Sequence, residues 1–446
     1  MHVRQNSVTL SLLALLLAGC GTNHAFAPLP SGSSAARMRN AATETVIYSF
    51  QAGNDGADPF GTLIADRSGA LYGTTAFGGG GSCFAGCGIV FKLTPLGSTY
   101  TETILYAFQG SNSNDGNGPA AGLVADASGA LYGTTEYGGN TAGDGTVFKL
   151  TPNGSSYSET VLHRFAGGKD GTAPLSSLTL DAHGNLYGTT LLGGNASACG
   201  TSGSGANVGC GTVFELARSG STYKERVLYR FQSGADGATP GSPPIIIGRR
   251  LVGTAATGGG NPSCGGAPIN RGCGTVYALT PGHKHARLTV LYAFTGEPSD
   301  GANPFAGLAM SKTGALYGTT QYGGSANEGS AFSLTPSGPQ YTEKLLHSFT
   351  GGSDGAYPLA QLALGKHGAL YGVTQYGGSS NAGIAFELRK AHGAYAESVL
   401  YVFATPAGGE YPVGGLFVGA GGTFFGTTSY GGDASAAAGT VFSLTP

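Results

Sequence analysis

The sequence predicts an all-β protein, a seven-bladed β-propeller built from four-stranded blades. A unit of about 59 residues recurs seven times, close to the length of a propeller blade with loop insertions. Each unit contains four short segments rich in Val, Leu, Tyr, Phe and Thr and bounded by Gly, Asp, Asn or Pro, which is typical of strands. Glycine supplies 82 of the 446 residues, against a usual share of about 7%, and it is the residue that tight turns with positive φ favour.

The rest of the composition excludes several classes of protein. Charged residues make up only 10% of the chain, which contains 22 Tyr and 21 Phe. A disordered chain would be rich in charge and poor in aromatic residues, and a long-helix protein would be rich in Ala, Glu, Lys and Leu. The net charge of −2 provides no basic surface for nucleic acid. We therefore expect no nucleic-acid partner.

The parts of each copy keep one order along the chain. In the first copy an apolar segment over 44–50 precedes an Asp-Gly and Pro turn over 54–59, a short apolar run over 61–66 and the segment ALYGTT over 70–75. After a Gly-Gly loop comes a segment such as GTVFKLTP, at 145–152 in the second copy. The seven copies are marked by the glycine of YGTT or its variants: Gly73, Gly133, Gly188, Gly253, Gly318, Gly372 and Gly426.

The strand pattern favours sheets that are covered on both faces. Apolar residues are adjacent in pairs such as Val147-Phe148 and Val161-Leu162, whereas a sheet with one wet face would alternate strictly. Blades packed between two neighbours meet this requirement. The run after Asp-Gly is then the innermost strand, ALYGTT the second, GTVFKLTP the third and the segment like 44–50 the outermost.

The two ends of the repeat region complement each other. The chain begins with an outermost strand, 44–50, and ends with a third strand, 439–446, that lacks an outer partner. We expect the first strand to complete the seventh blade and close the ring, because this pairing removes an open sheet edge.

The composite of ETVLY, Asp-Gly-x-x-Pro, LYGTT, Gly-Gly and GTVF resembles the GloVer tandem repeat of bacterial secreted proteins, which carry varied surface anchors. The resemblance covers about residues 44–446. The fourth copy departs from the pattern with LVGTA over 251–255 and Pro243-Pro244 in its first strand, and the seventh reads GGEYP over 408–412 and lacks the Asp. The resemblance implies architecture and location, and no activity or catalytic residue comes with it.

The first 19 residues are typical of a signal peptide. Arg4 precedes an apolar run over 10–18 that is too short to span a bilayer. The sequence Leu17-Ala18-Gly19-Cys20 resembles the bacterial lipobox, in which the chain is cut before a cysteine that carries lipid. The alternative is an ordinary secretory signal that contains a cysteine. By resemblance to lipoprotein sorting, Gly21 favours the outer membrane.

These features divide the chain into a signal peptide over 1–19, a flexible lipid-anchored linker over 20–43 and the propeller over 44–446. The linker prediction rests on small residues without a helical or strand period. We expect an exported monomer whose partners are the membrane, through the anchor, and an envelope or extracellular protein or glycan. Secretion into the medium is the alternative location.

Six further cysteines form three local pairs at the same place in the repeat, between the second and third strands. An even number in an exported chain favours disulfides, and the pairs lack nearby histidines that would suggest zinc. No cofactor or metal site is predicted. The predicted disulfides join Cys83 with Cys87, Cys199 with Cys210, and Cys264 with Cys273.

An aromatic residue precedes Gly-Gly in five copies, where an exposed ring could stack on a sugar. Leu192 and Thr257 replace it in the other two copies, and packing between blades is the alternative role. The candidate ligand-facing aromatics are Phe77, Tyr137, Tyr322, Tyr376 and Tyr430.

Titratable residues follow the repeat as well. The aspartate of Asp-Gly recurs in six copies, as a turn former or as part of a cation site. Glutamates of the outer segments, such as Glu102 and Glu159, are interpreted as charges that protect an exposed edge. His163 and His347 occupy the position of Tyr106, and no histidine belongs to a metal motif. No catalytic residue is predicted.

Three function hypotheses remain. The first is a non-catalytic binding or interaction module at the cell envelope, and the second is a carbohydrate-binding or polysaccharide-associated protein. The third is a propeller-type lyase or hydrolase with reactive groups at the central channel. The inner strands carry few charges beyond Asp66, Asp126 and Asp181 at their ends, which argues against general acid–base catalysis.

The anchor gives a direct test. Replacing Cys20→Ser removes the atom that would carry lipid, so the protein should move from the membrane fraction to the soluble fraction after cell lysis and centrifugation. A protein that stays in the membrane fraction would contradict the lipobox interpretation.

Overall fold

The computed structural model describes residues 42–97, 99–154, 156–199, 209–261, 264, 272–282, 286–296, 298–338, 340–391, 393–432 and 436–446. They belong to one compact unit, Ala36–Pro446. The predicted signal peptide, Cys20 and nearly all of the predicted linker lie outside the described residues. Among the described residues, no helix is long and apolar enough to cross a membrane.

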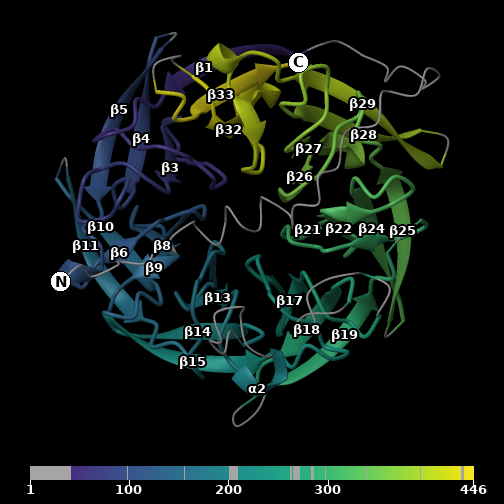
Figure 1. Cartoon of the computed structure of the whole chain (residues 1–446), viewed down its shortest axis with the longest axis horizontal. Coiled ribbons are helices and arrows are strands. Elements are labelled where there is room, and N and C mark those ends of the chain that lie inside the picture. The colour runs from purple at the N-terminus through teal and green to yellow at the C-terminus, as the bar shows by residue number, and fades with distance from the viewer. Residues whose placement is uncertain are drawn as a thin grey trace, which may run out of the picture. The chain divides into compact units, whose positions relative to one another are not determined.

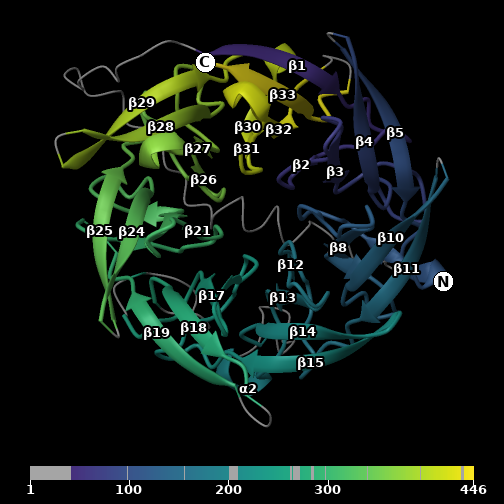
Figure 2. The same ribbon diagram turned by 180° about the vertical axis from the view of Figure 1, so that it is seen from behind.

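Seven antiparallel blades of four strands each form a ring, as the sequence predicts (Figure 1), and in the last blade a fifth short strand also pairs with the second strand. Figure 2 shows the short inner strands toward the centre and the long outer strands at the periphery. We number the blades one to seven by their inner strands. The inner strands are β2 (Ile64–Ala65), β7 (Val124–Ala125), β12 (Thr179–Leu180), β16 (Ile245–Ile247), β21 (Ala309–Met310), β26 (Ala363–Leu364) and β31 (Phe417–Val418). The second strands are β3 (Leu71–Thr75), β8 (Leu131–Thr135), β13 (Leu186–Thr190), β17 (Arg250–Ala255), β22 (Leu316–Thr320), β27 (Leu370–Thr374) and β32 (Phe424–Tyr430).

The longer strands follow in the same order. The third strands are β4 (Ile89–Leu96), β10 (Thr146–Asn153), β14 (Thr212–Ser219), β18 (Thr275–Thr280), β24 (Ser330–Ser337), β28 (Ile384–Ala391) and β33 (Thr440–Thr445). The outer strands are β5 (Thr99–Ala107), β11 (Ser156–Arg164), β15 (Thr222–Arg230), β19 (Arg287–Ala293), β25 (Gln340–Ser348), β29 (Ala394–Val402) and, for blade seven, β1 (Thr43–Ser49). The remaining elements are β6 (Gly116–Asn117), β9 (Tyr137–Gly138), β20 (Gly301–Ala302), β23 (Tyr322–Gly323), β30 (Glu410–Pro412), α2 (Ala196–Cys199) and the 3₁₀ turns η1 (Ser111–Ser113), η2 (Lys366–Gly368), η3 (Pro406–Gly408) and η4 (Ala420–Gly422).

The first strand of the described chain completes the last blade. β1 pairs antiparallel with β33, from Thr43 opposite Thr445 to Ser49 opposite Thr440, and the sheet order is β1-β33-β32. In Figure 1 the purple β1 lies along the yellow β33. The pairing confirms the predicted closure and covers the edge that β33 would otherwise expose.

The glycine of YGTT makes room for a phenylalanine of the third strand. Gly133 on β8 lies opposite Phe148 on β10, and a Cβ at Gly133 would approach Phe148 Cζ to 2.6 Å. Phe148 is fully buried and meets Phe108, from the end of the outer strand of blade one, edge to face at 5.0 Å. The second and third strands are therefore covered by side chains, because this contact recurs around the ring.

The outer strands depart from the expectation of strands covered on both faces. β5 alternates between exposed and partly buried residues over most of its length, because the outer side of each blade faces solvent. By contrast, the second strands β3 and β8 are buried throughout. The continuous apolar pattern thus describes the middle of each blade and not its periphery.

Threonine side chains join successive blades. Thr74 Oγ1 donates to the carbonyl of Ala121 at 2.8 Å, and Thr134 Oγ1 donates to the carbonyl of Ser176 at 2.9 Å. Each bond runs from the second strand of one blade to the segment before the inner strand of the next. The threonine pairs therefore act as structural contacts between blades.

Removing β1 should destabilise the ring more than its length suggests, because the loss exposes the β33 edge and opens blade seven. A variant that lacks residues 1–50 should unfold at a temperature lower by about 10 °C or more and should aggregate at micromolar concentration. A variant that lacks only residues 1–41 is the control. Equal melting temperatures in differential scanning calorimetry would contradict the closing role of β1.

Candidate functional site

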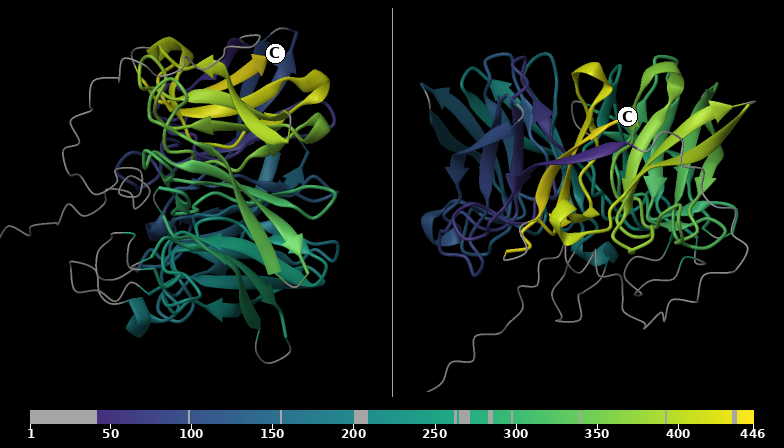
Figure 3. Two further views of the ribbon diagram at one scale, coloured as in Figure 1. Left: turned by 90° about the vertical axis from the view of Figure 1, so that its right-hand side faces the viewer. Right: turned by 90° about the horizontal axis from the view of Figure 1, so that it is seen from above.

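Two kinds of connection meet on one side of the ring, which we call the loop face. One leads from the outer strand of a blade through the Asp-Gly turn to the next inner strand, and the other joins the second strand to the third. Backbone pairing fixes them together: Ala302 pairs with Tyr322, and Ala356 pairs with Tyr376. Figure 3 shows the ring edge-on. This pairing places all five predicted aromatics on the loop face.

Next to each pair lies one residue in the left-handed region. Its N–H donates to the preceding blade, as from Tyr357 to the carbonyl of Glu328 and from Tyr411 to that of Ala382, each at 2.9 Å. The carbonyl of Tyr357 accepts from Gln375 N at 3.2 Å. Both backbone groups are thus held, so the conformation belongs to the scaffold. The residues at this left-handed position have φ between +53° and +69° and are Asp58, Gly118, Ala173, Thr239, Asn303, Tyr357 and Tyr411.

Tyrosine is a costly choice at this position. Glycine and asparagine adopt positive φ readily, as Gly118 and Asn303 do, whereas bulky residues there cost about 1–3 kcal/mol. The backbone needs no ring, because smaller residues fill the same position in five blades. The backbone conformation therefore does not account for tyrosine in blades six and seven, and the role of these residues lies in their aromatic side chains.

Those two rings complete a continuous row. Tyr357 lies between Tyr322 and Tyr376, with ring centroids at 5.3 and 5.8 Å, and Tyr411 lies between Tyr376 and Tyr430, at 5.4 and 6.3 Å. We call these five residues the tyrosine arc. It spans blades five to seven, and its last member, Tyr430, is 48% exposed. The other four are partly buried.

The arc contains three of the five predicted aromatics. Tyr322, Tyr376 and Tyr430 belong to it, whereas Phe77 and Tyr137 stand in blades one and two, where Asp58 and Gly118 leave no ring beside them. Sequence reasoning missed Tyr357 and Tyr411. The available signal was a tyrosine directly before the proline of DGAYP and GGEYP, where other copies carry a smaller residue.

Polar groups flank the arc. The left-handed position before it holds Asn303 and the one after it holds Asp58. Burial raises the pKa of Asp58 to about 6. Burial, followed by the charge of Glu328 and a hydrogen bond to its side chain, raises the pKa of Tyr357 to about 12, so the phenol keeps its proton. The arc thus offers aromatic rings between hydrogen-bonding side chains.

Three disulfides hold loops of the same face, as the sequence predicts. Cys83 with Cys87, Cys199 with Cys210, and Cys264 with Cys273 have Cα atoms 5.2, 5.3 and 5.1 Å apart. All lie between second and third strands. Structural disulfides form in an oxidising, exported environment.

The carboxylates of the Asp-Gly aspartates accept hydrogen bonds from backbone groups of the loop face. Asp115 accepts from Gln109 N at 2.8 Å and from the phenol of Tyr106 at 2.9 Å. Asp126, at the end of an inner strand, likewise accepts from Ser128 N at 2.8 Å. The described bonds of these carboxylates therefore support turns.

The outer-strand glutamates do not protect an exposed edge, which corrects that expectation. Their carboxylates are half-buried between neighbouring blades. Burial first, and then the charge of the neighbouring Asp-Gly aspartate, raises the pKa of Glu102 to about 7 and that of Glu397 to about 8. Among the described residues, one oxygen of each of these carboxylates is buried and has no hydrogen-bond partner: Glu44, Glu102, Glu159, Glu225, Glu343 and Glu397.

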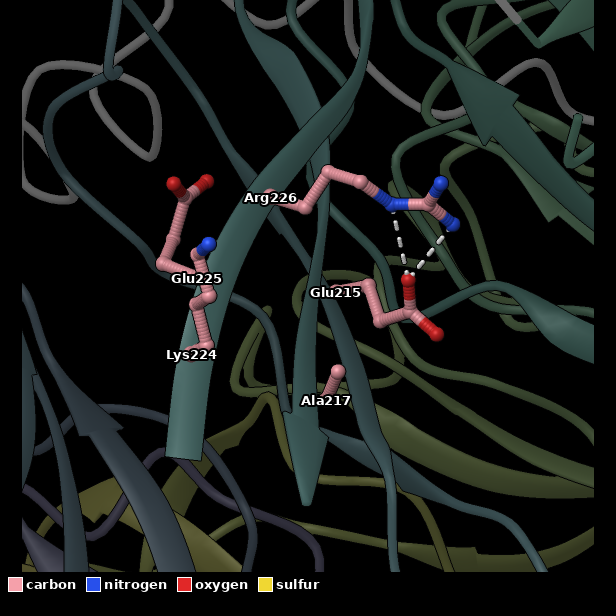
Figure 4. Close-up of a pocket in the computed structure, with 5 residues that line it drawn as sticks. All are labelled: Glu215, Ala217, Lys224, Glu225 and Arg226. Carbon is pink, nitrogen blue, oxygen red and sulfur yellow. Dashed lines mark hydrogen bonds and ion pairs between the residues drawn. The ribbon is translucent and has the colours of Figure 1, made fainter. Parts of the chain in front are cut away.

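An open depression lies on the third and outer strands of blade three (Figure 4). Arg226 on β15 forms an ion pair with Glu215 on β14 at 2.7 Å, and Ala217, Lys224 and Glu225 complete the lining. In Figure 4 the carboxylate of Glu225 points away from this ion pair. The ion pair occupies Arg226 and Glu215 and does not include Glu225.

The chain belongs to the Gloeobacter/Verrucomicrobia repeat family. The family model matches residues 33–266 and 263–446, which confirms the resemblance drawn from the repeated segments. No curated protein matches the chain.

Solved structures of low sequence identity are similar to the chain. A putative 6-phosphogluconolactonase from Bacteroides uniformis is 11% identical, with a TM-score of 0.50, over 84% of this chain and 98% of its own. A putative glucose dehydrogenase from Thermus thermophilus is 14% identical, with a TM-score of 0.44, over 90% and 99%. A gluconolactonase from Xanthomonas campestris is 13% identical, with a TM-score of 0.41, over 92% and 94%. At these identities the likeness concerns the fold alone.

The half-buried glutamates predict a pH-dependent stability. Burial, followed by the charge of Asp354, raises the pKa of Glu397 from its ordinary value of 4.5 to about 8 in the folded chain, so between these pH values the folded state retains a proton that the unfolded state releases. The contribution of Glu397 to the free energy of unfolding is therefore fully present below pH 4.5 and is lost as the pH rises through 8. Glu397→Gln should raise the free energy of unfolding at pH 9 by about 1–2 kcal/mol, after allowance for solvent screening.

The same variant should have no effect at pH 4. Denaturant unfolding at both pH values provides the measurement. Lys390→Gln, on the exposed part of β28, is the control and should leave the pH profile unchanged. An equal effect of Glu397→Gln at both pH values would contradict the burial of an ionising group.

Proposed function

We propose that this protein is a carbohydrate-binding propeller of the cell envelope and that the tyrosine arc is its binding site. The observation that carries the proposal is the placement of Tyr357 and Tyr411 at a left-handed position that smaller residues fill in the other blades. Strain of this kind concentrates at functional sites. Here the two tyrosines at strained positions complete one row of five rings on one part of the loop face.

The chemistry of the row favours a sugar chain. Tyrosine has an apolar ring face that can cover the C–H groups of a pyranose, and a phenol that can bond its hydroxyls. Asn303 and Asp58 at the two ends add hydrogen-bonding groups. The arc and these flanking residues include no Lys or Arg, which phosphate-bearing ligands would favour.

The length of the arc favours a polymer. Its four successive ring contacts measure between 5.3 and 6.3 Å, so the row extends beyond one sugar ring. A linear glycan could contact several tyrosines at once, and weak contacts would add within one chain. Stacking and hydrogen bonding require no reactive group, so the proposed activity is binding.

The location is part of the proposal. Three disulfides support an exported protein, and lipid on Cys20 would hold the propeller at the outer membrane. The glycan ligand would then be an envelope or extracellular polysaccharide.

A binding experiment tests the arc. Wild-type protein is run in native gels that contain soluble polysaccharides, neutral and acidic, and the glycans that retard it are measured by titration calorimetry. The double variant Tyr357→Asn, Tyr411→Asn introduces the residue that the scaffold uses at Asn303. It should bind at least about tenfold more weakly, because each aromatic contact contributes about 1 kcal/mol.

Tyr137→Thr is the matched control. It removes a predicted aromatic outside the arc and introduces the residue found at Thr257, so binding should be unchanged. Equal loss in both variants, or no retardation by any glycan, would contradict the proposal.

A further inference from the structure

The outer strands contain one position at which histidine replaces tyrosine in two blades. In blade one this position holds Tyr106, whose phenol donates to Asp115 at 2.9 Å. In blade two it holds His163, whose Nε2 lies 3.2 Å from Asp170 Oδ2. The replacement keeps the contact with the aspartate and exchanges a phenol for an imidazole, which is a good metal ligand.

A second carboxylate approaches from the neighbouring blade. Glu225 lies on β15, the outer strand of blade three, which contacts β11. One ring nitrogen of His163 and one carboxylate oxygen each from Asp170 and Glu225 lie within 4.8 Å of one another. Glu225 is the residue that points away from the Arg226 ion pair in Figure 4.

Two further observations point to a ligand. Among the described residues, Glu225 Oε1 is buried without a hydrogen-bond partner, as is the same atom of the other outer-strand glutamates. At Glu225 a histidine lies beside it, so a bound cation would satisfy this oxygen. The side chains of His163 and Asp170 are 20% and 21% exposed, so an ion can reach them from solvent. The cluster therefore has an unsatisfied oxygen and can be reached by an ion from solvent.

Arg230 on β15 is the neighbouring cation. It acts on both Asp170 and Glu225, and its Nε donates to the carbonyl of Lys169 at 2.8 Å. The set of one imidazole and two carboxylates suits first-row divalent ions, whereas calcium prefers six to eight oxygen ligands.

We propose that His163, Asp170 and Glu225 bind a first-row divalent cation, zinc or manganese, between the outer strands of blades two and three. Three protein ligands leave at least one coordination position for water. The ion would join two blades at the periphery, far along the chain from the tyrosine arc, so the site is independent of the proposed carbohydrate binding.

Blade five repeats the replacement with His347, whose Nε2 lies 3.4 Å from Asp354 Oδ2. Glu397 is the corresponding glutamate of blade six. Within the described part of the chain, only the cluster of His163 brings three such ligand atoms within 4.8 Å. We therefore assign one site.

Metal binding to the purified full chain tests the assignment. Titration calorimetry with zinc chloride and with manganese chloride should detect a site that His163→Tyr removes or weakens by about tenfold or more. His163→Tyr restores the residue of Tyr106 and its bond to the aspartate, so the metal-free variant should melt near the wild-type temperature. Glu225→Gln, which removes a charge at equal size, should weaken the same site.

His183→Asn and His347→Tyr are the controls, because they remove other histidines and should leave this site intact. Cobalt substitution adds a readout of coordination: its visible absorption should change in His163→Tyr and not in His183→Asn. Wild-type stoichiometry and affinity in both His163→Tyr and Glu225→Gln would overturn the proposal. So would the absence of any titratable site in the wild type.

Discussion

In each blade one residue of positive φ bonds the backbone to the blade before it. The N–H of that residue bonds to the preceding blade, and its carbonyl accepts from the second strand of its own blade, as Tyr357 shows with Glu328 and Gln375. Without that turn of the backbone, the chain could not pass from an outer strand to the next inner strand with both groups paired. The ring, the loop face and the row of tyrosines all depend on this local conformation.

The repeated and the unrepeated features have different meanings. A residue type that recurs in most blades, such as the threonine of Thr74 and Thr134 or the glycine opposite Phe148, serves the contact between strands or blades. Departures from the repeat are where function can reside. Two stand out here: tyrosine at the left-handed position of blades six and seven, and histidine at the outer-strand position of blades two and five.

Much of the fold could be predicted from sequence, because four strand segments in fixed order repeat seven times and all copies support the same strand assignment. The closure by β1 followed from counting the strands at both ends, and the disulfides followed from the place of the cysteines in the repeat. The burial of Glu397 could not be predicted, since it depends on how closely neighbouring outer strands pack. The same holds for the tyrosine arc, whose members come from three copies.

The cluster of His163, Asp170 and Glu225 shows most clearly what could not be predicted from the sequence. Its ligands come from two blades and lie 62 positions apart at the extremes, between His163 and Glu225, so no motif of fixed spacing could reveal them. Only the side-by-side placement of β11 and β15 brings them together. Local spacing identifies sites within one strand or turn, and this site lies between two repeats.

The pairing of β1 with β33 also sets an order of events in biogenesis. During synthesis the strand over Thr43–Ser49 emerges long before its partner over Thr440–Thr445. The ring therefore cannot close until β33 has been made and exported, and contacts of such long sequence separation form slowly. Until then β1 and the growing last blade both present unpaired edges. A cell that exports this protein must keep the first strand from pairing elsewhere while nearly four hundred residues follow it.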